Sequence, residues 1–258
     1  MQIIINKPYA LNETGKRVNN EDYIFPPKNR ATESDQMFIV CDGMGGYQGG
    51  EIASEAVCNS MAQFLMNAAT TSIDKEIFQK ALINAYEHLD SINKEGRINQ
   101  KAGTTLAFIK FYDRGAFTAH IGDSRIYQLR KDKAGMKIIH KSEDHSFVND
   151  LVKSGIITTR EAKTHPRRNI ITRSMQPMQE KRCKADICII DNIKPNDYFF
   201  LCTDGIYESI DDDKLCLILN MKISLEEKIN RIFDICQAGS KDNFSAYLIS
   251  VSEVNDES

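Results

Sequence analysis

The stretch Val40–Gly46, "VCDGMGG", ends an apolar run on a carboxylate followed by three glycines. The apolar residues 37–41 predict a buried strand that leads directly into Asp42. Two interpretations are open. Asp42 could start a β-turn whose glycines adopt positive φ. Alternatively, the strand holds the carboxylate rigidly, while the glycines let a ligand or ion approach the backbone. Alone, the stretch favours the turn, so the choice depends on the rest of the chain.

The composition is that of an ordinary globular protein. The chain has 258 residues, of which 41% are apolar and 27% charged, and its formal net charge is −3. This charge predicts affinity for neither nucleic acid nor membranes. No apolar run approaches the roughly 20 residues of a membrane span, and the N-terminus does not resemble a signal peptide. Seven cysteines without a Cys-x-x-Cys pair fit free thiols in a reducing compartment, so we expect a cytoplasmic protein.

The order of elements predicts an α+β fold with antiparallel sheets. Apolar residues recur at helical spacing over residues 52–65 and 77–89, and a short helix is expected from Phe147 to Gly155. Ser224 and Glu227 form a candidate capping box for a helix that ends at Gly239. Strand-like runs between and after the helices do not alternate regularly with them. We expect one domain over residues 1–252 and a polar tail over residues 253–258.

The opening pattern recurs along the chain. Apolar runs also lead to Asp123 in "FTAHIGDS" and to Asp204 in "YFFLCTDG", while Asp242 precedes the run "FSAYLISV". If these strands share a sandwich, their ends can bring the carboxylates together. Clustered carboxylates repel one another and raise each other's pKa unless a cation compensates. Oxygen ligands without His or Cys select Mg²⁺ or Mn²⁺, and several bridging aspartates suit two ions about 3.5–4 Å apart.

Other phosphate chemistries lack their motifs here. No cysteine is followed six positions later by arginine, and no Asp-x-Asp-x-Thr supplies an aspartyl nucleophile. No Gly-x-x-x-x-Gly-Lys-Ser/Thr loop is present, and five scattered histidines do not suit a histidine-rich hydrolase. A water activated by metals on aspartate ligands remains.

The motifs together resemble those of the metal-dependent protein phosphatase 2C family in its compact bacterial form. They run in the family's order along nearly the whole chain. They are "RVNNED" (17–22), "DGMGG" (42–46), "GGEIAS" (49–54), "AGTT" (102–105), "IGDSR" (121–125), "EDHSFVNDLVKSGIIT" (143–158), "HPRRNIITR" (165–173), "CTDG" (202–205) and "KDN" (241–243). The resemblance implies a four-layer αββα sandwich, in which two antiparallel sheets are flanked by antiparallel helix pairs.

The resemblance also implies roles for individual residues. Asp42 would bridge two tightly held metals, the Gly43 carbonyl would bind one, and Asp204 and Asp242 would hold the other. Asp123 would help to hold a third, weaker ion, and Arg17 would grip the substrate phosphate. A guanidinium suits that task because it donates two parallel hydrogen bonds and stays charged. Metal-bound waters would be held by Glu21, Asp22 and Asn243.

Two positions depart from the animal or bacterial pattern. Met44 stands where animal members place a histidine, so no side-chain general acid is apparent, and a metal-bound water would protonate the leaving group. Tyr47 stands where many bacterial members carry histidine, and the sequence gives no account of it. His165, Arg167 and Arg168 fall in a segment that forms a flap beside the active site in the family, where they could contact substrate or only solvent.

The sequence therefore predicts an enzyme that hydrolyses phosphoserine and phosphothreonine in proteins with Mn²⁺ or Mg²⁺. Water would attack phosphorus directly, without a phosphoenzyme. The alternative is a catalytically silent member that acts as a phosphoprotein-binding or regulatory module, whose mark would be lost ligands. By family habit, the partners would be a eukaryotic-like serine/threonine kinase and its phosphorylated targets. We expect a monomer that binds neither nucleic acid nor membranes.

Overall fold

Two antiparallel sheets form the centre of the computed structural model, which describes residues 2–45, 49–68, 73–113 and 115–255. Within these residues each sheet has six strands. The first has the order β1 (Gln2–Ile5), β12 (Phe244–Asn255), β11 (Tyr198–Cys202), β8 (Arg125–Asp132) and β9 (Gly135–Lys141), and β2 (Tyr9–Glu13) also pairs with β12. The second has the order β10 (Asp186–Ile190), β7 (Gly115–Ile121), β6 (Leu106–Tyr112), β4 (Met37–Met44) and β3 (Asp22–Phe25), and β5 (Gly103–Thr104) pairs with β4.

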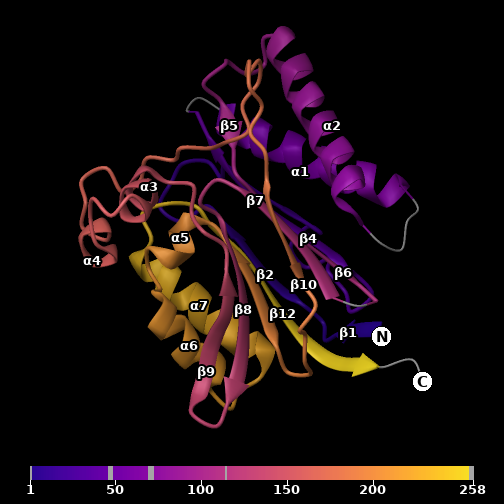
Figure 1. Cartoon of the computed structure of the whole chain (residues 1–258), viewed down its shortest axis with the longest axis vertical. Coiled ribbons are helices and arrows are strands. Elements are labelled where there is room, and N and C mark those ends of the chain that lie inside the picture. The colour runs from indigo at the N-terminus through magenta and orange to yellow at the C-terminus, as the bar shows by residue number, and fades with distance from the viewer. Residues whose placement is uncertain (1, 46–48, 69–72, 114, 256–258) are drawn as a thin grey trace.

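Helices cover the outer face of each sheet, which confirms the predicted four layers (Figure 1). α1 (Gly49–Asn67) and α2 (Lys75–Lys94) pack on the sheet that contains β4. α6 (Asp212–Asn220) and α7 (Leu225–Gly239) pack on the sheet that contains β11. The short α5 (Asp204–Tyr207) follows β11 directly. α3 (Phe147–Lys153) and α4 (Thr159–Ala162) lie beside the sandwich, in what we call the flap segment, residues 146–172.

β4 explains why the predicted strand reads as a continuous apolar run. Its alternate side chains face two different cores. Met37, Ile39 and Cys41 face the helices α1 and α2. Phe38 and Val40 face the space between the sheets, where the ring of Phe38 lies 5.0 Å from that of Tyr247. Both faces of the strand are therefore buried, and polar alternation is absent.

Most predicted elements are present. The helix expected from the capping box is α7, in which the Ser224 side chain accepts from the Glu227 backbone and the Glu227 carboxylate accepts from Ser224. β2 and β9 are among the strands that the sequence does not indicate. Both are strands whose side chains are mostly half-buried or exposed, so they lack a clear apolar period.

The boundary of the predicted polar tail is wrong. β12 runs to Asn255, past the expected end of the domain at residue 252. Glu253 and Val254 pair with Ile4 and Ile3 of β1, and Val254 packs partly against the core between the sheets. The strand continues because β1 supplies both the hydrogen bonds and an apolar surface.

Two predictions from composition can be compared with the structure. All seven cysteines are free thiols, as expected. Among the described residues, no helix is both long and apolar enough to cross a membrane.

Replacing Phe38 tests the core between the sheets. Its side chain is fully buried and lies between the rings of Tyr247 and Phe111. Phe38→Ala should lower the free energy of unfolding by about 3–5 kcal/mol, because it removes a large buried ring and leaves a cavity. Urea unfolding measures the loss. Val18→Ala, at a side chain that is 97% exposed, is the control and should stay within about 0.5 kcal/mol.

Candidate active site

The alternation of side chains between the two faces of β4 also determines the direction of the Asp42 side chain. Asp42 continues the row of Phe38 and Val40, so its carboxylate lies at one end of the space between the sheets. In the β3–β4 register Asp22 stands directly opposite Asp42. Directly paired residues on one face of a sheet have Cβ atoms about 4.5–5.5 Å apart. The strand pairing therefore places two carboxylates side by side at the end of an apolar core.

The opposite sheet adds Asp204 and Asp242 to the same end. Thr203 follows β11, and its hydroxyl donates a 2.9 Å hydrogen bond to Asp22 Oδ2, across the space between the sheets. Asp204 comes next and opens α5. α5 packs closely on the segment before β12, since a Cβ on Gly205 would lie 2.0 Å from the Asn243 carbonyl oxygen. This close packing holds Asp204 near Asp242.

Burial and mutual repulsion both act on these acids. Burial raises the pKa of Asp42 and of Asp204 well above the usual range, and the charges of neighbouring aspartates raise both further. Burial also raises the pKa of Asp22 to about 7, although the hydrogen bond from Thr203 opposes this. Such carboxylates are poorly stabilised as anions by the protein alone.

Asp123 joins the cluster from the turn between β7 and β8. Its Oδ2 accepts a 3.2 Å hydrogen bond from the Tyr207 hydroxyl. Its Oδ1 is buried, and no described residue donates a hydrogen bond to it. Burial, and then the charge of Asp144, raises the pKa of Asp123 to about 6. The orphaned Oδ1 is an unused acceptor beside other carboxylates.

Arg17 contacts a predicted metal ligand in this structure. Its Nη2 lies 2.6 Å from Asp242 Oδ2, and both side chains are partly exposed. The loop that carries Arg17 is held by Asn243, whose Nδ2 donates to the carbonyls of Thr14 and Asn19 at 2.8 Å. Asn243 Oδ1 accepts from the Glu21 backbone at 2.8 Å. The amide groups of Asn243 therefore hold the loop that carries Arg17.

Gly43 and Glu21 lie where α1 meets the strands. A Cβ on Gly43 would lie 2.2 Å from the Gly50 carbonyl oxygen and 2.4 Å from that of Glu21. The glycine is thus required by the close approach of the α1 N-terminus, a reason that the sequence interpretation did not include. Burial raises the pKa of the Glu21 carboxyl. Tyr47 lies outside the described residues.

The donor set suits hard divalent cations. The carboxylates of Asp42, Asp204, Asp242 and Asp123 act on one another electrostatically at one end of the sandwich, and Arg17 contacts Asp242. Buried and half-buried carboxylates with raised pKa values, together with the orphaned oxygen of Asp123, suit Mg²⁺ or Mn²⁺.

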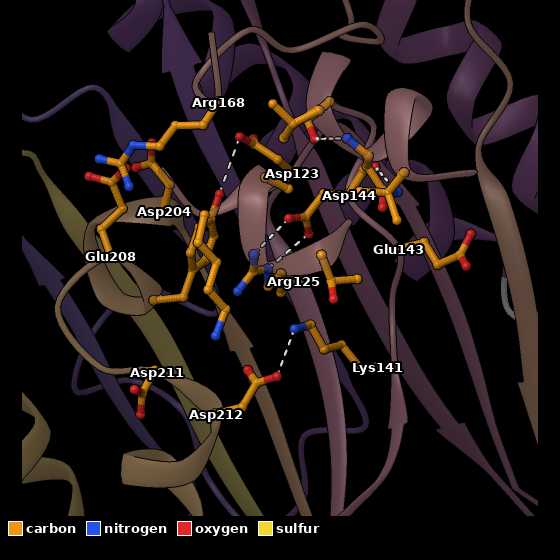
Figure 2. A pocket seen from close by; sticks show the side chains of 18 of the residues that line it. Asp123, Arg125, Lys141, Glu143, Asp144, Arg168, Asp204, Glu208, Asp211 and Asp212 are labelled. Atoms are coloured by element: carbon orange, nitrogen blue, oxygen red, sulfur yellow. Dashed lines mark hydrogen bonds and ion pairs between the residues drawn. The ribbon is translucent and has the colours of Figure 1, made fainter. Parts of the chain in front are cut away.

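A cavity of about 720 Å³ opens from this cluster (Figure 2). It runs between the flap segment and the β8–β9 side of the sandwich, and Asp123, Asp204 and Tyr207 line its inner end. Arg168 lines it from the flap segment, 3.2 Å from Glu208. The other two predicted flap residues face elsewhere. Arg167 stacks on Phe147, and His165 accepts from the backbone of Arg167.

Sequence reasoning missed several residues of the site. Tyr207 reaches Asp123, and Arg125 makes a two-point ion pair with Asp144 at 2.8 and 2.6 Å in the cavity wall. Thr203 bridges the sheets. The motifs that contain these residues are recognisable in the sequence. The direction in which a tyrosine or threonine side chain points depends on tertiary packing, however, so the sequence does not predict these contacts.

Comparison with known proteins identifies the family. A family-wide sequence comparison matches residues 15–247 to Protein phosphatase 2C. The chain belongs to the protein phosphatase 2C family. Protein phosphatase PhpP of Streptococcus pneumoniae is 32% identical over 241 residues, which cover 92% of this chain and 94% of that protein.

Solved structures of the family agree. The Mycobacterium tuberculosis serine/threonine phosphatase PstP/Ppp has a TM-score of 0.81 at 25% identity, over 97% of this chain and 100% of that one. The serine/threonine phosphatase Stp1 of Staphylococcus aureus has a TM-score of 0.80 at 27% identity, over 98% of each chain. These relatives agree with the predicted fold and enzyme class.

The carboxylate cluster predicts an unusual pH dependence of stability in EDTA. Asp22 has a pKa of about 7 when folded against a usual 3.8, so between these values the folded state holds a proton that the unfolded state has lost. The free energy of unfolding should therefore fall as pH rises from about 4 to 7, by up to about 1.4 kcal/mol per pH unit, and should level off above pH 7. Thermal unfolding across this range measures it.

Asp22→Asn is the decisive variant for this prediction. The asparagine keeps an acceptor for Thr203 and cannot ionise, so the slope of stability against pH should become shallower. Mn²⁺ should restore stability to the wild type at pH 8. An equal slope in Asp22→Asn and the wild type would show that this carboxyl does not titrate as described.

Proposed function

We propose that the protein is a Mn²⁺- or Mg²⁺-dependent serine/threonine phosphatase that hydrolyses phosphoserine and phosphothreonine in proteins. The observation that supports it most is the cluster of buried and half-buried aspartates, two of which, Asp123 and Asp204, line a cavity, with Arg17 in contact with Asp242. Names of relatives that include protein phosphatase and serine/threonine phosphatase agree with the proposal.

The chain's residues divide into those that hold cations and those that hold substrate. Asp42, the Gly43 carbonyl, Asp204 and Asp242 would together hold two ions. Asp123 would take part in a third, weaker site through its free Oδ1. When bound, the ions would supply activation of the attacking water and neutralise charge on the phosphate. Glu21 and Asp22 would orient waters around them, and Asn243, predicted for the same role, would instead act by holding the loop that carries Arg17.

Arg17 would bind the phosphate oxygens. In this structure it donates to Asp242, so the arginine and the cations compete for the same carboxylate. With Asp242 engaged by a cation, Arg17, whose side chain is 57% exposed, would turn from Asp242 toward a phosphate. The ion pair with Arg17 stabilises the Asp242 carboxylate. Replacement of the guanidinium by a cation would leave Arg17 available to bind the substrate phosphate.

The cavity would accept the peptide around the phosphorylated residue. Its volume is about 720 Å³, and most of the residues that line it are polar or charged (Figure 2). Arg168 is the predicted flap residue that lines it, so we propose substrate contact for Arg168. His165 and Arg167 would act by ordering the flap through Phe147.

The rival function, a catalytically silent phosphoprotein-binding module, would leave the carboxylate cluster without a purpose. Burying acids at raised pKa destabilises a fold, and a binding module gains nothing from it. Every predicted acid is present, and Asp42, Asp123 and Asp204 act on one another electrostatically. We therefore favour the enzyme.

A phosphopeptide panel assayed with Mn²⁺, Mg²⁺ and EDTA tests this function. Activity should require a divalent ion and disappear in EDTA. Asp42→Asn, Asp204→Asn and Asp242→Asn should each lose nearly all turnover and bind fewer ions by calorimetry, because each removes a charge and a ligand. Asp234→Asn, on an exposed position of α7, is the control. Full activity in EDTA would overturn the proposal.

Arg17→Ala tests phosphate binding. Loss of a charge-assisted contact should cost about 1.5–3 kcal/mol, or roughly ten- to over a hundredfold in kcat/KM on a phosphopeptide. Binding of Mn²⁺ should not weaken, because the competitor for Asp242 is gone. Lys16→Ala, which removes the same charge from the neighbouring position, should change kcat/KM less than about twofold. Equal effects of the two variants on kcat/KM would show that Arg17 acts only as a surface charge and does not bind the phosphate.

A further inference from the structure

His145 makes two hydrogen bonds to one residue, the glycine before Asp123. Its backbone N–H donates to the Gly122 carbonyl at 3.0 Å, and its ring Nδ1 accepts from the Gly122 N–H at 3.0 Å. The side chain is 4% exposed. Gly122 adopts φ +99°, and a Cβ there would lie 2.5 Å from the Thr105 side chain. His145 therefore fixes both polar groups of a glycine whose conformation sets the direction of Asp123.

The surroundings of His145 fix its tautomer. Because Nδ1 accepts from a backbone N–H, the proton of the neutral ring lies on Nε2. Nε2 donates to Asp186 Oδ2 at 3.1 Å, and Arg173 donates to the other oxygen of the same carboxylate at 2.9 Å. Burial lowers the pKa of His145, which favours the neutral ring. The imidazole is thus held at both nitrogens.

One nitrogen of His120, one nitrogen of His145 and a carboxylate oxygen of Asp186 lie within 4.8 Å of one another, a spacing that fits a metal site. Their geometry excludes it. The two rings stack at 4.6 Å with 15° between their planes, so an ion in the plane of one ring lies outside that of the other. Arg173 Nη1 already lies 3.2 Å from His145 Nε2 and supplies the cation. The group is an ion-pair network around a neutral histidine.

His145 also stands where the flap segment begins and ends. Its carbonyl accepts from the Thr172 N–H at 2.8 Å. One residue further in, Ser146 and Ile171 form an isolated bridge, and the Phe147 N–H donates to the Ile170 carbonyl at 2.8 Å. The two ends of the flap segment are therefore closed at His145, whose ring holds Gly122 on the other side.

We propose that His145 is a positioning residue. It holds the Gly122–Asp123 turn so that Asp123 Oδ1 faces the carboxylate cluster, and it ties that turn to the base of the flap segment. The positioning itself follows from the contacts above. Its effect on turnover rests on the proposed phosphatase function.

Two substitutions separate the contacts of the ring. His145→Asn keeps an acceptor near the position of Nδ1, toward Gly122, and loses the reach to Asp186. His145→Gln keeps a donor near the position of Nε2 and loses the acceptor for Gly122. The Gly122 amide should exchange with solvent about tenfold faster in metal-free His145→Gln, and much less so in His145→Asn. His88→Gln, a histidine of α2 that contacts Ser60, is the control and should leave Gly122 unchanged.

The catalytic consequence is measured by Mn²⁺ activation. His145→Gln should need about tenfold more Mn²⁺ for half-maximal turnover, with a smaller change in KM for the phosphopeptide. In the Asp123→Asn background, His145→Gln should add almost nothing, because both changes disable the same group. Independent, additive losses would overturn the proposal and leave His145 a merely structural residue.

Other outcomes also decide between the two claims. If the wild type is inactive with every divalent ion, the phosphatase function fails, while Gly122 exchange still tests the positioning. Equal exchange rates in His145→Asn and His145→Gln would overturn the positioning while the function stands. If His145→Gln does not fold, Asp186→Ala replaces it, since that side chain is half exposed. It frees Nε2 and should speed Gly122 exchange severalfold, and an unchanged rate would contradict the proposal.

Discussion

The burial of several carboxylates at one end of an apolar core is the constraint on which this structure depends. Asp22 and Asp42 are placed there by the pairing of β3 with β4, and Asp204 by the end of β11. Anions in such a place repel one another and lose hydration. The protein offsets this with hydrogen bonds from Thr203 and Tyr207 and with the charge of Arg17. The compensation is incomplete, and divalent cations would complete it.

The rest of the architecture keeps these acids in place. Two sheets joined by a core that contains tilted and edge-to-face aromatic pairs fix the distance between Asp42 and the opposite strands. Glycines at positions 43 and 205 allow α1 and α5 to pack against neighbouring backbone where a side chain would collide. On the cavity side, His145 closes the base of the flap segment and holds the turn that carries Asp123. Rigid elements thus hold the inner site, and a loop-rich segment borders its entrance.

The sequence was informative where a local pattern and the fold agree. A strand that ends on Asp-Gly, repeated along the chain, indicated Asp42 and Asp204, and a capping box marked the start of α7. It was uninformative where the direction of a side chain depends on packing against residues distant in the sequence. No local sequence pattern predicts the contact of Arg17 with Asp242 or that of Tyr207 with Asp123. The same holds for the hydrogen bonds between His145 and Gly122. The edge strand β9 and the far end of β12 were missed or shortened because their pairing partners, rather than their own apolar period, stabilise them.

Anomalous diffraction from crystals grown with Mn²⁺ tests the central claim most directly, because it locates the ions independently of activity. Two strong manganese peaks should lie on either side of the Asp42 carboxylate, one of them also in contact with Asp204 and Asp242. Arg17 should have left Asp242 in the same crystals. The absence of manganese from the carboxylate cluster, with the Arg17–Asp242 ion pair intact at saturating Mn²⁺, would contradict the account.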